Sequence, residues 1–91
     1  MNRAVWKFPL QPGSPSVVRM PRGSIVIHVG HDGDTAPVLW AMVETNALLV
    51  GREFWVYGTG HDLPSGVSAL DHQGSVQTPS GLVWHVFEGA R

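Results

Sequence analysis

The feature that most constrains the fold is an alternating aromatic run within residues 53–64 that breaks abruptly into glycines. Trp55 and Tyr57 would point to one side of a β-strand and Phe54 and Val56 to the other, because successive side chains alternate across a strand. Two glycines follow within three residues, where they permit backbone angles and close approaches that a Cβ forbids. The run therefore predicts a core strand that delivers a loop.

The same period-two pattern recurs along the chain, between turn signals spaced by roughly 8–12 residues. Further strands are expected at residues 3–8, 16–20, 24–30, 37–44, 67–77 and 82–88. The pattern predicts one all-β domain over residues 1–91, a small antiparallel β-sandwich or barrel of six to seven short strands.

Three details of this prediction are specific enough to be tested. Residues 24–30 are apolar on both faces, which indicates a strand buried on two sides. Residues 45–52 would form either one helical turn or a loop with apolar anchors, and the loop is favoured. Gly74 interrupts its strand and is expected to mark a bulge or a bend.

Charge and cysteine content exclude several classes of protein. Six Lys and Arg residues oppose seven Asp and Glu residues without forming a run, which disfavours a general nucleic-acid or membrane surface. The chain has no cysteine, which fits a reducing compartment, and it shows no signal peptide and no apolar run near the ~20 residues of a membrane helix. A cytoplasmic protein is expected.

Catalysis and metal binding have candidate residues but no convincing arrangement. His28 and His31, with Asp32 and Asp34 beside them and His61 or His85 brought near by folding, would supply metal ligands. The alternative is that His28 and His85 have hydrogen-bonding partners within the sheet and that the other histidines lie on the surface. The acid–base candidates are Asp62, Asp71, Glu44, Glu53 and His61. No strand–turn–helix elbow presents a nucleophile. We therefore expect no enzyme, no metal and no cofactor.

Ligand binding is the stronger hypothesis. The Gly58-Thr59-Gly60 segment is either a tight turn or a nest of backbone N–H groups for an anion. The four tryptophans would lie mostly in the core, although one or two of them, with Tyr57, would be able to stack on a planar ligand whose phosphates meet an arginine. The expected binding residues are Trp55, Tyr57, Gly58, Thr59, Gly60, His61 and Asp62, together with Arg22 and Arg52.

The order of motifs resembles a family of small uncharacterised proteins from phages and prophages. The residues that carry the resemblance are RAVWKFPL at 3–10, HV at 28–29, LWAMV at 39–43, YGTGH at 57–61, LP at 63–64, GSVQ at 74–77 and VWHVFE at 83–88. The family pattern has an acidic or polar loop near 44–52, where this chain has an apolar run from Ala47 to Val50. The resemblance implies a phage accessory protein that acts in the host cytoplasm.

These observations together predict an anti-defence binding protein. It would be a β-rich homo-oligomer that sequesters a small nucleotide-type immune signal without catalysis. The alternative is a protein–protein interaction module of phage origin, regulatory or virion-associated. A small metal-dependent hydrolase built on the histidines is the third hypothesis.

Overall fold

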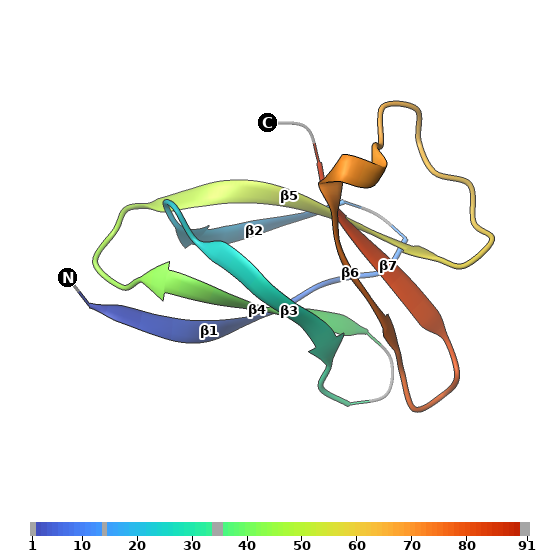
Figure 1. Ribbon diagram of the computed structural model, residues 1–91, viewed down its shortest axis with the longest axis horizontal. Helices are drawn as coiled ribbons and strands as arrows, with labels where there is room; N and C mark the ends of the chain where they lie inside the picture. The colour runs from blue at the N-terminus through green and yellow to red at the C-terminus, as the bar shows by residue number, and fades with distance from the viewer. Residues whose placement is uncertain (1, 14, 34–35, 90–91) are drawn as a thin grey trace.

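The chain folds into seven β-strands and one short 3-10 helix in a computed structural model that describes residues 2–13, 15–33 and 36–89 (Figure 1). The elements in chain order are β1 (Arg3–Pro9), β2 (Ser16–Pro21), β3 (Ile25–His31), β4 (Pro37–Glu44), β5 (Leu49–Gly58), η1 (Ala69–Asp71), β6 (His72–Gln77) and β7 (Val83–Glu88). The alternating pattern thus located all seven strands, and the bounds expected for residues 37–44 agree at both ends.

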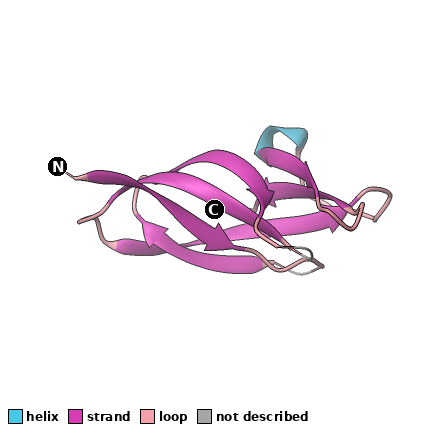
Figure 2. Cartoon of the chain, turned by 90° about the horizontal axis from the view of Figure 1, so that it is seen from below, coloured by secondary structure: helices cyan, strands magenta, loops and turns pink. Residues whose placement is uncertain are grey.

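The strands form two antiparallel sheets. One sheet has three strands in the order β1-β4-β3, and the other has four in the order β2-β5-β7-β6. The molecule measures 42 × 30 × 18 Å, and its edge-on view shows the flattened shape of two stacked layers (Figure 2). The predicted antiparallel sandwich is confirmed, and the sheets do not close into a barrel.

The core lies between the sheets and is made by every second residue of the strands. Phe54 and Val56 of β5 and Val86 of β7 face Leu39 and Ala41 of β4, and all five are fully buried. The buried apolar residues that complete this cluster are Leu10, Val18, Met20, Val29 and Val43. Burial of these side chains is the main stabilising contribution to the fold.

The prediction that residues 24–30 are buried on both faces is wrong. Ile25 and Ile27 expose 57% and 53% of their surface. The pairing of β3 with β4 shifts between Val26 and His28, so that Ile27 is the extra residue of a β-bulge. Val26 and Val29 therefore both face the core although they are three residues apart, and Ile27 is left on the outer surface.

The prediction of a loop at residues 45–52 is wrong for its second half. β5 begins at Leu49 because its first six residues pair with β2, from Leu49 opposite Pro21 to Phe54 opposite Ser16. From Phe54 onward, the same strand pairs with β7. β5 is ten residues long because its first part pairs with β2 and its last part pairs with β7.

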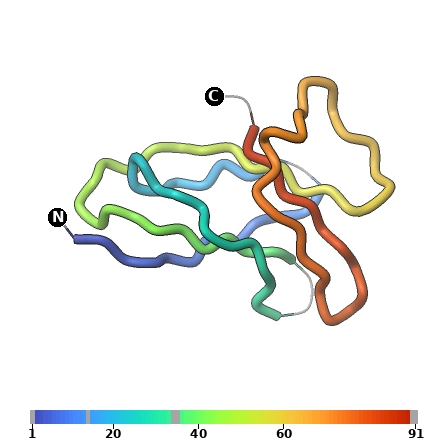
Figure 3. The backbone as a smooth tube through the Cα atoms, in the orientation of Figure 1, coloured from blue at the N-terminus to red at the C-terminus, as the bar shows by residue number. Residues whose placement is uncertain are grey.

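The strand expected at residues 67–77 is confirmed only from His72 onward. Ser68 instead caps η1, because its hydroxyl accepts from the N–H of Leu70 while Asp71 accepts from the N–H of Ser68. The resulting loop from 59 to 71 projects beyond the sheets (Figure 3).

The bulge expected at Gly74 is confirmed, since the pairing of β6 with β7 shifts between His72 and Gly74. A Cβ at Gly74 would lie 2.9 Å from the Cβ of Val29, so this glycine permits β6 to approach β3 closely. The two bulged strands thus close one side of the sandwich.

Candidate functional site

The outer face of the four-stranded sheet carries a row of aromatic and histidine side chains where β5 and β7 pair. Trp55 lies opposite Phe87, and Tyr57 lies opposite His85. Residues directly opposite each other in a sheet lie on the same face, and so do residues two apart on one strand. All four side chains therefore point away from the core. The alternation that buries Phe54 on one side of β5 therefore builds this surface on the other.

Two cavities open at the end of β5, and they share three residues. The first, of about 200 Å³, has Tyr57, Leu63 and Phe87 as apolar walls. Its polar side is formed by Gly58, Thr59, Gly60, His61 and His85. The second, of about 290 Å³, is lined by Gly58, Thr59, His61, Gly81, Leu82, Val83 and Trp84. The segment from Gly58 to His61 thus forms the ridge between them.

Hydrogen bonds join hydroxyl groups and imidazoles in a chain that ends at this ridge. Thr59 Oγ1 lies 2.7 Å from His85 Nε2, and His85 Nδ1 lies 2.7 Å from Ser75 Oγ. Ser75 Oγ also lies 2.9 Å from His72 Nε2, and the His72 ring meets the ring of Phe87 edge-on at 5.3 Å. A neutral imidazole donates from one nitrogen and accepts at the other. The hydrogen bonds of this series are therefore able to run in either of two directions. A group that binds at Thr59 would select one of them.

The glycines of the loop allow this arrangement for two different reasons. The N–H of Gly58 donates to His61 Nδ1 at 3.2 Å, and a Cβ on Gly58 would lie 2.9 Å from Cε1 of the same ring. Gly60 has φ +86°, which side chains with a Cβ rarely adopt. The N–H of Thr59 donates to the Val83 carbonyl at 3.3 Å. Two of the three N–H groups of a predicted anion nest therefore already have partners within the protein.

The structure brings together five of the predicted binding residues and separates the rest. Tyr57, Gly58, Thr59, Gly60 and His61 line the first cavity. Asp62 follows in the exposed loop and is not among its lining residues. Trp55 lies at a smaller cavity of about 90 Å³ beyond Phe87, where its indole N–H donates to Glu53 Oε1 at 2.7 Å.

Arg52 does not reach the cavity, because its guanidinium is held elsewhere. Its Nε and one terminal nitrogen donate to the two carboxylate oxygens of Glu88, at 2.7 and 2.9 Å, and its other terminal nitrogen donates to the Ser24 carbonyl. The hydrogen bond to Glu88 raises the pKa of Arg52 and outweighs the opposing effect of burial. This arginine ties β5 to β7 and to the turn that follows β2.

Arg22 lies still farther away, in the turn between β2 and β3. Its N–H donates to the Leu48 carbonyl, next to the first residue of β5, whereas Gly58 is the last residue of that strand. Nine residue steps of about 3.3 Å place roughly 30 Å between these two points. The predicted meeting of an arginine with a ligand at the glycine loop is therefore not seen.

Ser75, His72 and Phe87 were not among the predicted site residues, and His85 was expected either as a metal ligand or as a hydrogen-bonding partner within the sheet. The interpretation of His85 as a hydrogen-bonding partner is confirmed by its two hydroxyl contacts. These residues come from β6 and β7, and the order β5-β7-β6 brings them beside Tyr57 of β5. The sequence showed on which alternating face of its own strand Tyr57 or His85 lies, but it did not show that the two residues pair.

The other catalytic candidates have structural partners or lie apart. Asp71 caps η1, and Glu53 accepts from an indole. No group of three or more His, Asp or Glu side chains within residues 2–13, 15–33 and 36–89 is placed to hold a metal ion. Asp34, one of the predicted ligands, lies outside the described residues.

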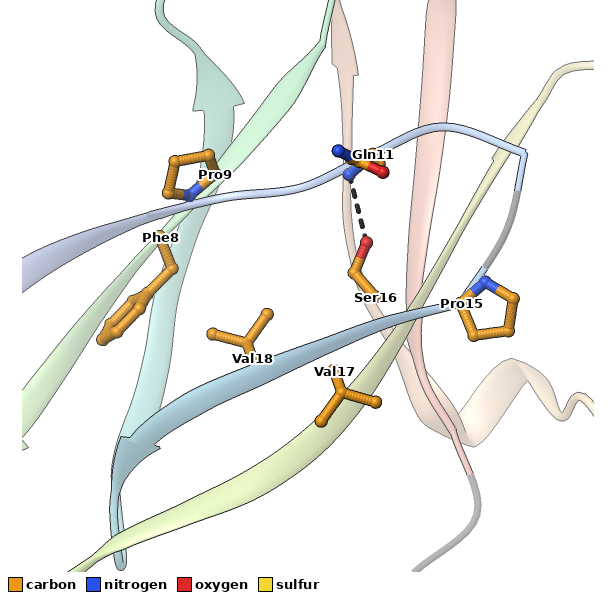
Figure 4. Close-up of a pocket in the computed structure, with 7 residues that line it drawn as sticks. All are labelled: Phe8, Pro9, Gln11, Pro15, Ser16, Val17 and Val18. Carbon is orange, nitrogen blue, oxygen red and sulfur yellow. Dashed lines mark hydrogen bonds between the residues drawn. The ribbon is translucent and has the colours of Figure 1, made fainter.

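A cavity larger than either of the two at the end of β5 lies at a different place, and its lining residues include no titratable group. It measures about 460 Å³ and opens between the end of β1 and the start of β2, where Phe8 and Val18 lie on its two sides (Figure 4). Its remaining lining residues are Pro9, Gln11, Pro15, Ser16 and Val17. We therefore place the candidate site at the end of β5, where the polar groups converge.

Comparison with known proteins gives the family but no activity. A model of a domain of unknown function (DUF7352) matches residues 1–91, and the chain belongs to this family. No curated protein and no solved structure matches the chain significantly. None of the helices among the described residues is long and apolar enough to span a membrane.

Proposed function

We propose that this member of a family of unknown function is a binding protein, and that it holds a small nucleotide-type ligand without catalysis at the end of β5. The observation that carries the proposal is the hydrogen bond of Thr59 to His85 within a cavity walled by Tyr57 and Phe87. Binding sites for small molecules typically combine apolar walls with a few convergent polar groups.

The lining residues fit the parts of a nucleotide in different ways. The half-buried ring of Tyr57 offers apolar surface to a planar base, beside the ring of Phe87, which is only 9% exposed. The Thr59 hydroxyl and the imidazole of His61 offer hydrogen-bonding groups to a sugar or a phosphate, while both nitrogens of His85 are bonded to Thr59 and Ser75. Arg52 is bonded to Glu88 and supplies no positive charge to this cavity.

The arrangement favours binding over catalysis because the pair of Thr59 and His85 lacks a carboxylate. In hydrolases with a hydroxyl nucleophile, a carboxylate behind the histidine stabilises the imidazolium that forms during the reaction. Here the second nitrogen of His85 meets the hydroxyl of Ser75 instead. A hydroxyl fixes the ring orientation but supplies no compensating charge.

In the phage setting that the resemblance implies, such a protein would act by sequestration in the host cytoplasm. A homo-oligomer present in excess over an immune signal would lower the concentration of that signal and leave it chemically intact. Affinity and abundance would suffice for this role.

A protein-binding module is the second candidate function, and the outer face of the three-stranded sheet favours it. Val5, Ile25 and Ile27 are more than half exposed there, beside the partly buried Trp40 and Met42. An exposed apolar patch of this kind is typical of protein interaction sites.

Native mass spectrometry of the protein with a mixture of cyclic and linear nucleotides tests the proposal. We expect a fixed mass gain per protomer, and we expect denaturation to release the same mass unaltered. A Thr59→Val variant keeps the side-chain shape but removes the hydroxyl, so it should weaken binding by about tenfold. Thr45→Val is the matched control, because its exposed hydroxyl bonds to Asn2 far from the cavity.

Three results would contradict the proposal. A released ligand of changed mass would establish catalysis. Absence of a mass gain with every nucleotide, or equal weakening by the two threonine variants, would exclude this cavity as the binding site.

A further inference from the structure

Of the four edge strands in the two sheets, β1 is the least protected against pairing with another chain. β3 and β6 each contain a bulge, and they pack against each other at Val29 and Gly74. β2 has proline immediately before it and at its last residue. β1 runs for seven residues in unbroken register, with proline only at its end. Exposed edges without bulges or internal prolines are templates for strand pairing.

The backbone groups that β1 presents to its open side follow from two hydrogen bonds at its ends. The N–H of Thr45 donates to the Asn2 carbonyl, and the N–H of Leu10 donates to the Pro37 carbonyl. In an antiparallel pair, every second residue bonds to the neighbouring strand, so the even-numbered residues from 2 to 10 bond towards β4. The N–H and C=O groups of Arg3, Val5 and Lys7 therefore point outward.

We propose that β1 pairs with β1 of a second copy of this chain, antiparallel, about a two-fold axis at Trp6. The two three-stranded sheets then form one continuous sheet of six strands. A two-fold axis at Val5 would place Arg3 opposite Lys7 of the second copy, and like charges directly across a strand pair are destabilising. The axis at Trp6 instead places Val5 opposite Lys7 of the second copy, which removes this repulsion.

The side chains on the inner face of β1 also suit this register. Trp6 is 38% exposed although it shares its face with Ala4 and Phe8, both of which pack against the core. At the two-fold axis, Trp6 would meet Trp6 of the second copy, and Ala4 would meet Phe8. A small residue opposite a large one on both sides of an aromatic pair allows the two strands to approach.

The assembly closes as a dimer because the opposite edge of each three-stranded sheet is β3, which is bulged and packed against β6. The contact is a single strand pair, so it belongs with the small interfaces of less than about 1,200 Å². We therefore expect a reversible dimer, with a dissociation constant on the order of 10 µM. The cavity at the end of β5 lies on the outer face of the other sheet and remains open in this dimer. Dimerisation through β1 therefore does not depend on the proposed ligand.

Opposite charges introduced at Val5 test both the interface and its register. In the proposed register, Val5→Glu faces Lys7 of the second copy and should tighten the dimer about threefold, whereas Val5→Lys should weaken it by a similar factor. Val5 is 54% exposed and its backbone does not bond to β4, so both variants should keep the fold. Sedimentation equilibrium from about 1 to 300 µM measures the effects, with thermal unfolding as the check on folding.

The outcomes separate the alternatives. Opposite shifts for the two variants, reduced at high salt, support the proposal. Weakening by both variants would overturn it in favour of a two-fold axis at Val5 or a face-to-face contact. A protein that is monomeric over the whole range, or a dimer that neither variant changes, would also overturn it.

Discussion

Arg52 was a predicted ligand residue, and the structure makes it a determinant of stability instead. It donates to both carboxylate oxygens of Glu88 and to the Ser24 carbonyl, and its guanidinium lies 5.8 Å from the centre of the Phe54 ring. The side chains of Arg52 and Glu88 are only 21% and 6% exposed. Replacement of Arg52 by methionine would remove the two donors that Arg52 supplies to a buried carboxylate.

The expected cost follows from this burial. Loss of one partner of a buried ion pair typically costs about 3–5 kcal/mol, because a charge remains in a poorly solvated place. Arg52 is partly accessible, so we expect about 2–3 kcal/mol for Arg52→Met. For a domain of this size, that corresponds to a decrease of roughly 10–20 °C in Tm. The Arg52→Met/Glu88→Leu double variant should recover most of the loss, since replacing both members of a buried pair by apolar residues is often nearly neutral.

Urea and thermal unfolding of the wild type, the two single variants and the double variant provide the measurement. Lys7→Met is the control, because the Lys7 and Asp32 pair lies on the surface, and removing such a pair has little effect on stability. The reasoning is refuted if Arg52→Met costs less than about 1 kcal/mol, or if the double variant is as unstable as the sum of the single variants. A loss of nucleotide affinity in an Arg52→Met protein that remains fully folded would restore the predicted role in binding.

Two further predictions concern the approach of β6 to β3 and the surface ion pair. Gly74→Ala places a methyl group 2.9 Å from the Val29 Cβ and should lower the free energy of unfolding, measured in urea, by about 1–3 kcal/mol. Gly51→Ala is the control and should cost less, because its methyl group meets only the exposed Val17. Equal costs for the two variants would show that β6 can move away from β3. The hydrogen bond and charge of Lys7 hold the pKa of Asp32 below its ordinary value, so the pair stabilises the fold above the unfolded pKa of about 3.9 and this contribution is lost as the pH falls through the folded pKa. The small difference in Tm between the wild type and Lys7→Met at low salt should therefore be present at pH 7 and vanish near pH 2; a difference that persists in acid would contradict this.

The strands of this fold could be predicted because their signal is local. The period of two at residues 37–44 is seen in β4, where Leu39, Ala41 and Val43 are buried and the residues between them are only partly buried. The errors arose where a distant partner decides the outcome. Leu49 to Arg52 form a strand because β2 lies beside them, and Ile27 is exposed because β3 gains a residue relative to β4.

The candidate site shows the same division between local and distant information. The glycines at 58 and 60 indicated a constrained loop at the end of β5. This signal is local, because Gly60 has a positive φ and Gly58 leaves room for the ring of His61, three residues away. The polar groups that give the loop its chemistry come from Ser75 and His85, which are placed by the order of strands in the sheet. Residues one strand apart in space but ten apart in sequence carry no mutual signal in a single chain. It follows that a search for this site in related sequences should seek a hydroxyl residue at 59 with a histidine at the position that pairs with Tyr57, and not the glycine loop alone.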